Sequence, residues 1–300
     1  MKKPSIIWIQ GVSCNGNAHS FFNHPELFEI LSNFELLYHP LLETNYTLED
    51  VAKCELECDI LIVEGAYKDT LVKYGMDIAQ TIQHYATKAS KIIATGTCAS
   101  YGGMFALYDE ALSGFCYKKE LPNENYSRYK DKFIMLPGCP IHPKWLSFVL
   151  LMIKDKKPIV LDEMHRPQEL YGFTVHTGCS RNEYFEWKID MEGFGKKEGC
   201  LFYEHGCQAP FTKGSCNKIL WHDISSKTIA GTPCFGCTEP TFPKINLFET
   251  KTNIGIPANM PLGVSKRAYL TLTGIAKSFK IKRLKQRVID YEDRTDYRED

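Results

Sequence analysis

The sequence predicts an α/β protein with a doubly wound parallel sheet in its first half, followed by a small, irregular metal-binding domain. Apolar runs alternate with helix-like segments over residues 5–153, which is the pattern of such a sheet. Six of the twelve cysteines lie from Cys179 to Cys237, where this alternation has faded. We therefore expect two domains, residues 1–158 and residues 159–300.

Short apolar runs rich in β-branched residues mark the strands. Continuous runs of this kind fit strands that are buried on both faces of a parallel sheet. The predicted strands are residues 5–9, 34–38, 59–63, 91–95 and 132–136, of which 34–38 is the weakest.

The segments between these strands carry helical patterns. Apolar residues recur at helical spacing over 21–31 and 76–85, and a strongly apolar helix over 145–153 follows the last strand. Residues 50–57 form a short candidate helix that begins near Thr47, a residue suited to capping. This alternation predicts right-handed crossovers between parallel strands.

Three cysteines lie in Gly-containing turns that directly follow predicted strands. Because all such turns open at the carboxyl edge of a parallel sheet, Cys14, Cys98 and Cys139 would meet in one crevice. The nearby glycines permit close approach of the backbone to a bulky inorganic ligand. The alternative is three buried structural cysteines, since free cysteine is among the most buried residue types.

Glu64 ends a predicted strand at this crevice. A carboxylate in such a place is costly unless it is paired or hydrogen-bonded. We expect Glu64 to order the loops around the cysteines or to contact a proton path.

The second half contains two further sets of metal-ligand residues. His176, Cys179, Cys200 and Cys207 form a four-ligand set, and Cys216, Cys234 and Cys237 form a three-ligand set. Metal binding would supply folding energy that the weak periodicity does not. Zinc is the alternative for the first set, because three cysteines and one histidine are an ordinary zinc site. Three thiolates alone suit zinc poorly, whereas an iron–sulfur cluster lacking one iron corner needs only three.

Composition excludes several other classes. Lys and Arg total 36 and so do Asp and Glu, which gives no electrostatic case for nucleic-acid binding. No apolar run approaches the roughly 18 residues of a membrane span, and neither common nucleotide-binding glycine motif is present. The opening residues do not resemble a secretion signal. With clustered thiols this favours a reducing, cytoplasmic location over a disulfide framework.

Taken together, these motifs resemble the small subunit of nickel–iron hydrogenases along most of the chain. The resemblance rests on Gly11 and Cys14-x-Gly, Val63-Glu64-Gly65, Gly96-Thr97-Cys98-Ala99, Pro137-Gly138-Cys139-Pro140, His176 with Cys179-Ser-Arg181, Gly206-Cys207-x-x-Pro210, and Pro233-Cys234-x-Gly236-Cys237-x-Glu239-Pro240. It implies a flavodoxin-like domain that holds a proximal four-iron cluster, and a second domain that holds medial and distal clusters.

Carried over by position, the resemblance implies which residues bind each cluster. Cys14, Cys98 and Cys139 would bind the proximal cluster; Cys216, Cys234 and Cys237 a medial three-iron cluster; and His176, Cys179, Cys200 and Cys207 a distal four-iron cluster. The chain would relay electrons from H2 oxidation at a nickel–iron centre in an obligate large subunit to an external acceptor, in a dimer of heterodimers. A hydrogen-sensing regulatory hydrogenase would share these ligands, and a quinone-linked complex subunit would share only the first domain.

The chain departs from the family pattern at Asn17, where the usual motif has a second cysteine. A similar Cys-x-Gly-Asn occurs in cytoplasmic uptake hydrogenases of the cyanobacterial type. The fourth proximal ligand therefore stays open between the Asn17 amide oxygen, His19, a water or an incomplete cluster. Lys227 stands near the position of a proline beside the medial cluster in many relatives, and no fourth cysteine accompanies it.

The remaining cysteines and the charged tail receive simpler interpretations. Cys54, Cys58 and Cys116 fit small packed side chains better than a further metal or redox site. Residues 277–287 are strongly basic and residues 290–300 strongly acidic, which fits either a solvated surface or a docking arm.

Overall fold

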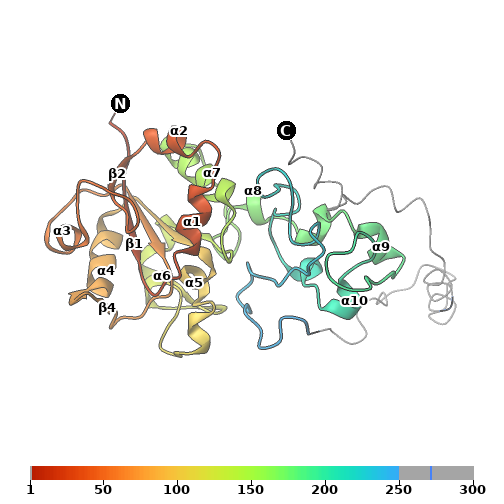
Figure 1. Ribbon diagram of the computed structural model, residues 1–300. Helices are drawn as coiled ribbons and strands as arrows, with labels where there is room; N and C mark the ends of the chain where they lie inside the picture. Colours follow the sequence, from red (N-terminus) through yellow and green to blue (C-terminus); the bar gives the residue numbers. More distant parts are fainter. Residues whose placement is uncertain (1, 250–270, 272–300) are drawn as a thin grey trace. The chain divides into compact units, whose positions relative to one another are not determined.

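The computed structural model describes residues 2–249 and Thr271, which divide into two compact units (Figure 1). The first unit contains the described residues up to Gly172 and a returning segment, Cys237–Pro243. The second contains Phe173–Gly236 and the described residues from Lys244 onward. We expected the division at residue 158, but it lies later in the chain, after Gly172. The charged stretches 277–287 and 290–300 lie outside the described residues.

The first unit is built on a five-stranded sheet in which all strands are parallel. Its order is β2-β1-β3-β6-β9, the flavodoxin-like order, and the α/β prediction is confirmed. The strands are β1 (Ser5–Gln10), β2 (Glu35–Tyr38), β3 (Ile60–Glu64), β6 (Lys91–Thr95) and β9 (Phe133–Leu136). Two small hairpins pair β4 (Val72–Lys73) with β5 (Met76–Asp77), and β7 (Tyr117–Lys118) with β8 (Leu121–Pro122).

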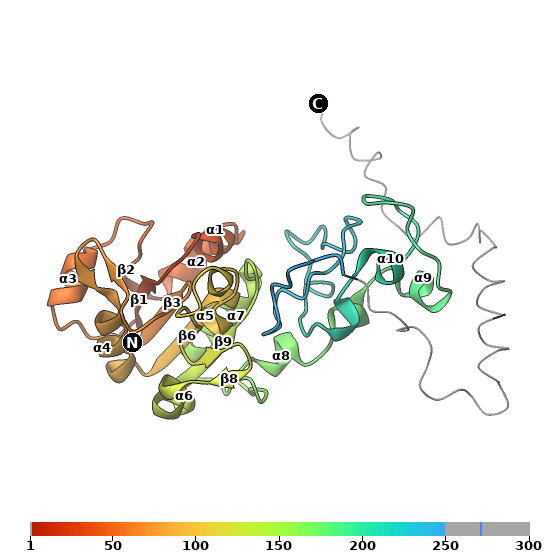
Figure 2. The same ribbon diagram turned by 90° about the horizontal axis from the view of Figure 1, so that it is seen from below.

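Helices cover both faces of this sheet (Figure 2). The described helices of the first unit are α1 (Gly16–Phe22), α2 (Leu27–Ser32), α3 (Leu48–Lys53), α4 (Ile78–Lys88), α5 (Gly96–Tyr101), η1 (Phe105–Leu107), α6 (Glu124–Tyr129), η2 (Lys130–Lys132), α7 (Pro143–Lys154) and α8 (Gln168–Tyr171). None of the helices in the described part of the chain is long and apolar enough to cross a membrane.

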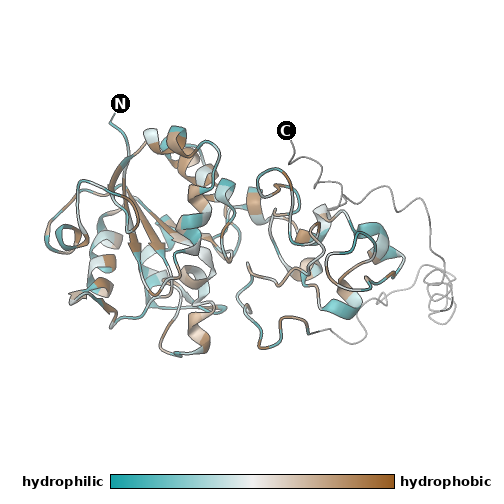
Figure 3. Ribbon diagram, viewed as in Figure 1, coloured by the Kyte–Doolittle hydropathy of each residue, from teal (hydrophilic) through white to brown (hydrophobic). Residues whose placement is uncertain are grey.

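Alternate residues of each strand pack against opposite helical layers. Ile7 and Ile9 of β1 join the core cluster that contains α4. Trp8 points to the other face, where Phe21 of α1 and Leu150 of α7 line the same small cavity. The strands are accordingly apolar on both faces, as their brown colour in Figure 3 shows, and this explains why their sequences read as continuous apolar runs.

The predicted helix over residues 21–31 is wrong in one respect, because the structure forms two helices there. α1 starts earlier, at Gly16, and ends at Phe22, before Pro25. Proline disfavours helical backbone in the residue before it and cannot donate a backbone hydrogen bond, so the chain turns before α2 begins. Phe28 of α2 is 87% exposed and does not contribute to the buried face that we expected.

The capping prediction at Thr47 is confirmed. The Thr47 side chain accepts a hydrogen bond from the Asp50 backbone N–H, and the Asp50 carboxylate accepts one from the Thr47 backbone N–H. This reciprocal capping box fixes the start of α3. The helix ends at Lys53, earlier than the predicted residue 57.

The second unit has little regular structure. Its described helices are η3 (Val175–Gly178), α9 (Asn182–Glu186), α10 (Phe202–His205) and η4 (Ala209–Phe211), and its described β-structure consists of isolated bridges. Helices of this length are not stable by themselves in water. Their core contains three cysteines among the apolar residues: Val175, Tyr184, Met191, Cys200, Leu201, Phe202, Cys207, Ala209 and Cys234.

Replacing Ile82 by Ala should destabilise the first unit substantially. Ile82 of α4 is fully buried in the core cluster. The change removes apolar contacts and leaves a cavity, which should lower the free energy of unfolding by about 2–5 kcal/mol. Gln80→Ala on the exposed face of the same helix is the matched control and should change the free energy of unfolding by less than about 0.5 kcal/mol. Urea denaturation followed by circular dichroism measures both. Equal effects of the two changes would contradict this packing.

Candidate metal centres

The carboxyl ends of four strands bring the first cysteine set to one edge of the sheet. Gln10, Glu64 and Thr95 are paired across β1, β3 and β6, and Thr95 pairs with Leu136 of β9. The loops that follow are held together, because the Thr97 N–H donates to the Gly138 carbonyl oxygen at 2.9 Å. Cys14, Cys98 and Cys139 lie in or directly after these loops.

Two glycines press against the sulfur atoms of this set. A Cβ added at Gly16 would lie 3.2 Å from the Cys14 Sγ and 3.9 Å from the Cβ of Pro140. A Cβ added at Gly103, where φ is +53°, would lie 2.7 Å from the Cys98 Sγ. Side chains at these positions would therefore crowd the thiols, which agrees with the expected role of glycine beside an inorganic ligand.

The thiols of this set differ in their surroundings. Burial raises the pKa of Cys98, hydrogen bonds from the Met104 and Phe105 backbones lower it, and the neighbouring Cys14 and Glu64 raise it further. Cys14 and Cys139 are exposed. Three sulfur donors at one edge, of which Cys98 is partly buried, fit a cluster that is bound at the surface of this unit.

Glu64 accepts hydrogen bonds from several groups close to the first cysteine set. Its carboxylate is fully buried and accepts from the Trp8 Nε1–H (3.0 Å), the Gln10 side chain (3.0 Å), and the backbone N–H groups of Asn17 (3.1 Å) and Ala18 (3.4 Å). The expectation that this carboxylate is hydrogen-bonded is confirmed. Through these contacts Glu64 fixes the start of α1 relative to β1 and β3.

Asn17 connects three loops of the same edge. Its Oδ1 accepts from the Ile141 N–H at 3.0 Å, and its Nδ2 donates to the Thr95 carbonyl oxygen at 3.4 Å. The side chain is buried and fills the space beside Gly96, where a Cβ would lie 2.2 Å from the Asn17 Nδ2. The amide therefore joins the end of β6 to the loop after β9, and we call this pair of hydrogen bonds the Asn17 clasp. The sequence did not indicate this linking role. The other proposed ligand, His19, is exposed on α1 beside the ring of Phe22.

The second unit brings together the thiols of the four-ligand set. Burial raises the pKa of Cys200 to about 12, and the nearby Cys207 and Cys179 contribute to the same shift. Burial likewise raises the pKa of Cys207 to about 11, while backbone N–H groups of Ala209 and Cys234 oppose the shift. Buried thiols of this kind stay protonated unless a metal binds them, because an uncompensated thiolate in an apolar core is unfavourable.

His176 lies in η3, one turn before Cys179. Burial lowers its pKa, with an opposing contribution from Glu186, so the ring is neutral at pH 7 as a metal ligand must be. The ring of Phe185 packs edge-on against it, with the two ring centroids 4.4 Å apart. The donor set is thus one neutral imidazole and three thiols, which fits an iron–sulfur cluster and equally fits the zinc set considered from the sequence.

The three-ligand set is divided between segments of the chain. Cys234 belongs to the core of the second unit, and Cys216 packs against that core. Cys237 begins the returning segment of the first unit, where its carbonyl oxygen accepts a hydrogen bond from the Thr97 hydroxyl. Gly236 between them has φ +75°, a conformation that favours glycine. Lys227 lies over the ring of Phe235, 4.2 Å from its centroid.

Ligands of a cluster need not converge on a point, since each thiolate binds its own iron atom. Within the described part of the chain, no three His, Cys, Asp or Glu side chains meet at single-ion distances.

The cysteines outside the three sets differ in exposure. Cys58 and Cys116 are buried, and burial raises the pKa of both thiols, that of Cys58 to about 12. Such thiols are inert packed side chains, as expected for these two positions. Cys54 is exposed at the C-cap of α3, so the expectation of a packed side chain is wrong for this cysteine.

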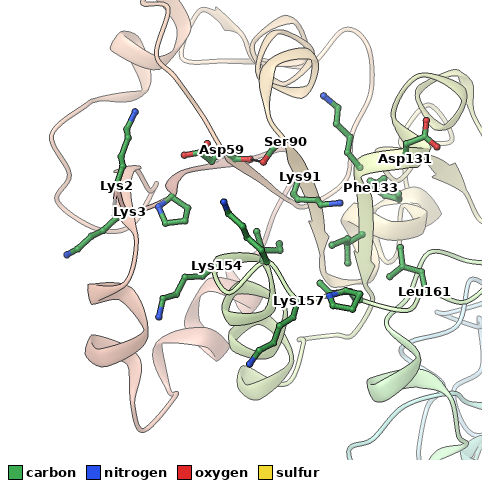
Figure 4. Close-up of a pocket in the computed structure, with 17 residues that line it drawn as sticks. Lys2, Lys3, Asp59, Ser90, Lys91, Asp131, Phe133, Lys154, Lys157 and Leu161 are labelled. Atoms are coloured by element: carbon green, nitrogen blue, oxygen red, sulfur yellow. Dashed lines mark hydrogen bonds between the residues drawn. The ribbon is translucent and has the colours of Figure 1, made fainter.

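A groove of about 760 Å³ lies at the opposite, amino edge of the sheet (Figure 4). Lysines surround it, and apolar residues such as Phe133 and Leu161 also line it. The seven lysines are Lys2, Lys3, Lys91, Lys132, Lys154, Lys156 and Lys157. Four of them are already engaged by the protein. Lys132 donates to the Thr87 and Ala89 carbonyl oxygens, Lys2 pairs with Glu57, and both Lys154 and Lys157 pair with Asp155. No cysteine lines this groove, so it is separate from the candidate metal sites.

Comparison with known proteins gives consistent matches over both units. The family model for the carboxyl-terminal domain of NiFe/NiFeSe hydrogenase small subunits matches residues 171–249. The model for the 20 kDa subunit of NADH–ubiquinone oxidoreductase matches residues 14–153.

Individual relatives span most of the chain. The F420 non-reducing hydrogenase I small subunit of Methanosarcina mazei is 30% identical over 287 residues, which covers 80% of this chain and 74% of the relative. The periplasmic [NiFe] hydrogenase small subunit 1 of Nitratidesulfovibrio vulgaris is 31% identical over 261 residues and covers 80% of each. The reduced Ni-Fe-Se hydrogenase structure from Desulfomicrobium baculatum matches with a TM-score of 0.70 at 25% identity, covering 83% of this chain and 100% of that one.

The Asn17 clasp and an Asn17 ligand predict different results for Asn17→Cys. If the amide only joins the loops, Cys leaves the Ile141 N–H and the Thr95 carbonyl unpaired, which costs about 1–3 kcal/mol and loosens the crevice. Asn17→Cys and Asn17→Ala should then both lower the iron content of the first unit. Iron and labile sulfide analysis of the two variants checks this. A fully loaded Asn17→Cys cluster with a lowered reduction potential would contradict the clasp and support Asn17 as a ligand.

Proposed function

The chain belongs to the small-subunit family of nickel–iron hydrogenases, and we propose that it carries electrons between a large-subunit active site and an external acceptor through three iron–sulfur clusters. The three separate ligand sets carry this proposal. Iron–sulfur clusters accept and release single electrons when bound, so successive clusters form a relay.

The residues of each set have distinct tasks in this proposal. Cys14, Cys98 and Cys139 would hold the proximal four-iron cluster, in a crevice that Asn17 and Glu64 keep in shape. The medial three-iron cluster would be held by Cys216, Cys234 and Cys237. The distal four-iron cluster would be held by His176, Cys179, Cys200 and Cys207.

Hydrogen bonds to the sulfur atoms support the electron-transfer role. The Arg181 backbone N–H donates to the Cys179 Sγ at 3.4 Å, and the Cys234 backbone N–H donates to the Cys207 Sγ at 3.3 Å. Such bonds delocalise negative charge from the sulfurs and favour the reduced cluster. The apolar neighbours of Cys200 and Cys207 keep water away from the same site.

The nickel–iron centre would lie in a large subunit that forms a heterodimer with this chain. We expect two such heterodimers to associate. Two relatives are named as hydrogenases of different kinds, one F420 non-reducing and one periplasmic, so their names do not indicate the acceptor of this chain. The cytoplasmic location is proposed from the sequence alone.

Replacing Cys234 by Ser should separate electron transfer from H2 activation. In a complex co-expressed with its large subunit, loss of a medial ligand should abolish most H2-dependent dye reduction, because electrons cannot leave. Exchange between H2 and heavy water occurs at the large subunit and should persist. Cys116→Ser, which changes a buried cysteine outside the ligand sets, is the matched control and should retain both activities. Unchanged dye reduction in Cys234→Ser would remove the medial cluster from the proposal.

Replacing His176 by Cys should lower the reduction potential of the distal cluster. The change substitutes an anionic thiolate for a neutral imidazole, and added negative charge disfavours the reduced state. A redox titration of the complex monitored by electron paramagnetic resonance measures the potential of each cluster. Identical potentials in wild type and His176→Cys would exclude His176 as a ligand.

A further inference from the structure

Arg181 is a buried arginine whose described partners are all uncharged. Its side chain is 2% exposed. The Nε–H donates to the Thr228 carbonyl oxygen at 2.6 Å, and the two terminal nitrogens donate to the carbonyl oxygens of Gly199 (2.7 Å) and Lys196 (2.6 Å). Nη1 also lies 3.4 Å from the Met191 Sδ. The guanidinium is therefore well hydrogen-bonded, yet no described carboxylate forms an ion pair with it.

A buried positive charge without a counter-ion is unusual. Arginine stays protonated in proteins, and buried charges are normally paired because desolvation is costly. Arg166, the comparable residue of the first unit, follows this rule. It is 3% exposed and pairs with Asp162 at 2.9 Å and Glu239 at 3.5 Å. The two arginines are equally buried, but among the described residues only Arg166 has carboxylate partners.

The groups that stand in place of carboxylates around Arg181 are cysteines. The Arg181 backbone N–H donates to the Cys179 Sγ at 3.4 Å, and its Nη1 donates to the carbonyl oxygen of Gly199, the residue before Cys200. Nη1 also contacts Met191, which lies in the same core cluster as Cys200 and Cys207. These three cysteines belong to the four-ligand set. As neutral thiols they cannot balance the guanidinium, but as thiolate ligands they can.

We propose that Arg181 is the counter-ion of the distal cluster, and that its buried charge raises the reduction potential of that cluster and stabilises its thiolate ligands. The proposal rests on the proposed function, because it requires the distal cluster to be present. Arg181 does not bind iron in this account. It acts through two of the ligand residues. Its backbone N–H donates to the Cys179 sulfur, and its side chain donates to the carbonyl oxygen of Gly199, the residue before Cys200.

The geometry also predicts which feature of the side chain matters. Lysine would keep the charge but would lose the planar fork that reaches three carbonyl oxygens. Glutamine would keep some hydrogen bonding but would lose the charge. Comparing Arg181→Lys with Arg181→Gln therefore separates charge from positioning.

The test is a redox titration of the complete large- and small-subunit complex, monitored by electron paramagnetic resonance, with iron and labile sulfide measured on the same samples. Arg181→Gln should shift the distal equilibrium toward the oxidised cluster by about tenfold or more, which corresponds to about 59 mV for a one-electron couple. Arg181→Lys should retain most of the wild-type potential. Arg166→Gln is the matched control and should leave the distal potential unchanged.

The outcomes distinguish the possible failures. Loss of the distal cluster in Arg181→Gln but not in Arg181→Lys would also support the counter-ion role, because only the charge separates the two variants in that case. Equal potentials in Arg181→Gln and wild type, or equal loss of the cluster in both variants, would overturn it and leave Arg181 a hydrogen-bonding support. Absence of a distal cluster from the wild-type complex would instead refute the proposed function.

Discussion

The burial of cysteine thiols is the constraint on which the second unit depends. Cys200, Cys207 and Cys234 lie in its core, yet the described helices around them have at most five residues. Segments this short cannot supply their own stability, and neutral thiols contribute little more than small apolar side chains. Metal–thiolate bonds would join these segments and supply folding free energy directly. We infer that ligand binding and folding are one process in this unit.

The first unit follows a different logic, because its sheet and helices form a core without metal. There the fold creates the site: parallel strands end together, and their loops bring three cysteines to one edge. Asn17 and Glu64 make the edge rigid through hydrogen bonds between loops that are far apart in the sequence. In the proposed relay, the proximal site is formed by a fold that is stable without metal. The medial and distal clusters would themselves stabilise the fold that binds them.

Much of the first unit was predictable from sequence because its strands are buried on both faces and read as unbroken apolar runs. The position of Cys14, Cys98 and Cys139 followed from the rule that loops of a parallel sheet share an edge. The break before α2 was missed because the apolar spacing continues across Pro25. The later division of the units was missed because it depends on distant contacts, such as the Tyr171 hydroxyl donating to the Pro137 carbonyl oxygen. The sequence marked Arg181 only as part of the Cys179-Ser-Arg181 motif, and its burial without an ion pair to any described carboxylate then indicated a role for it.

The most direct test of this account is Mössbauer spectroscopy of the 57Fe-enriched complex of this chain with its large subunit, combined with zinc and labile-sulfide analysis. The account predicts two four-iron clusters and one three-iron cluster in addition to the iron of the active site. Zinc in the cysteine sites, with no labile sulfide, would contradict it.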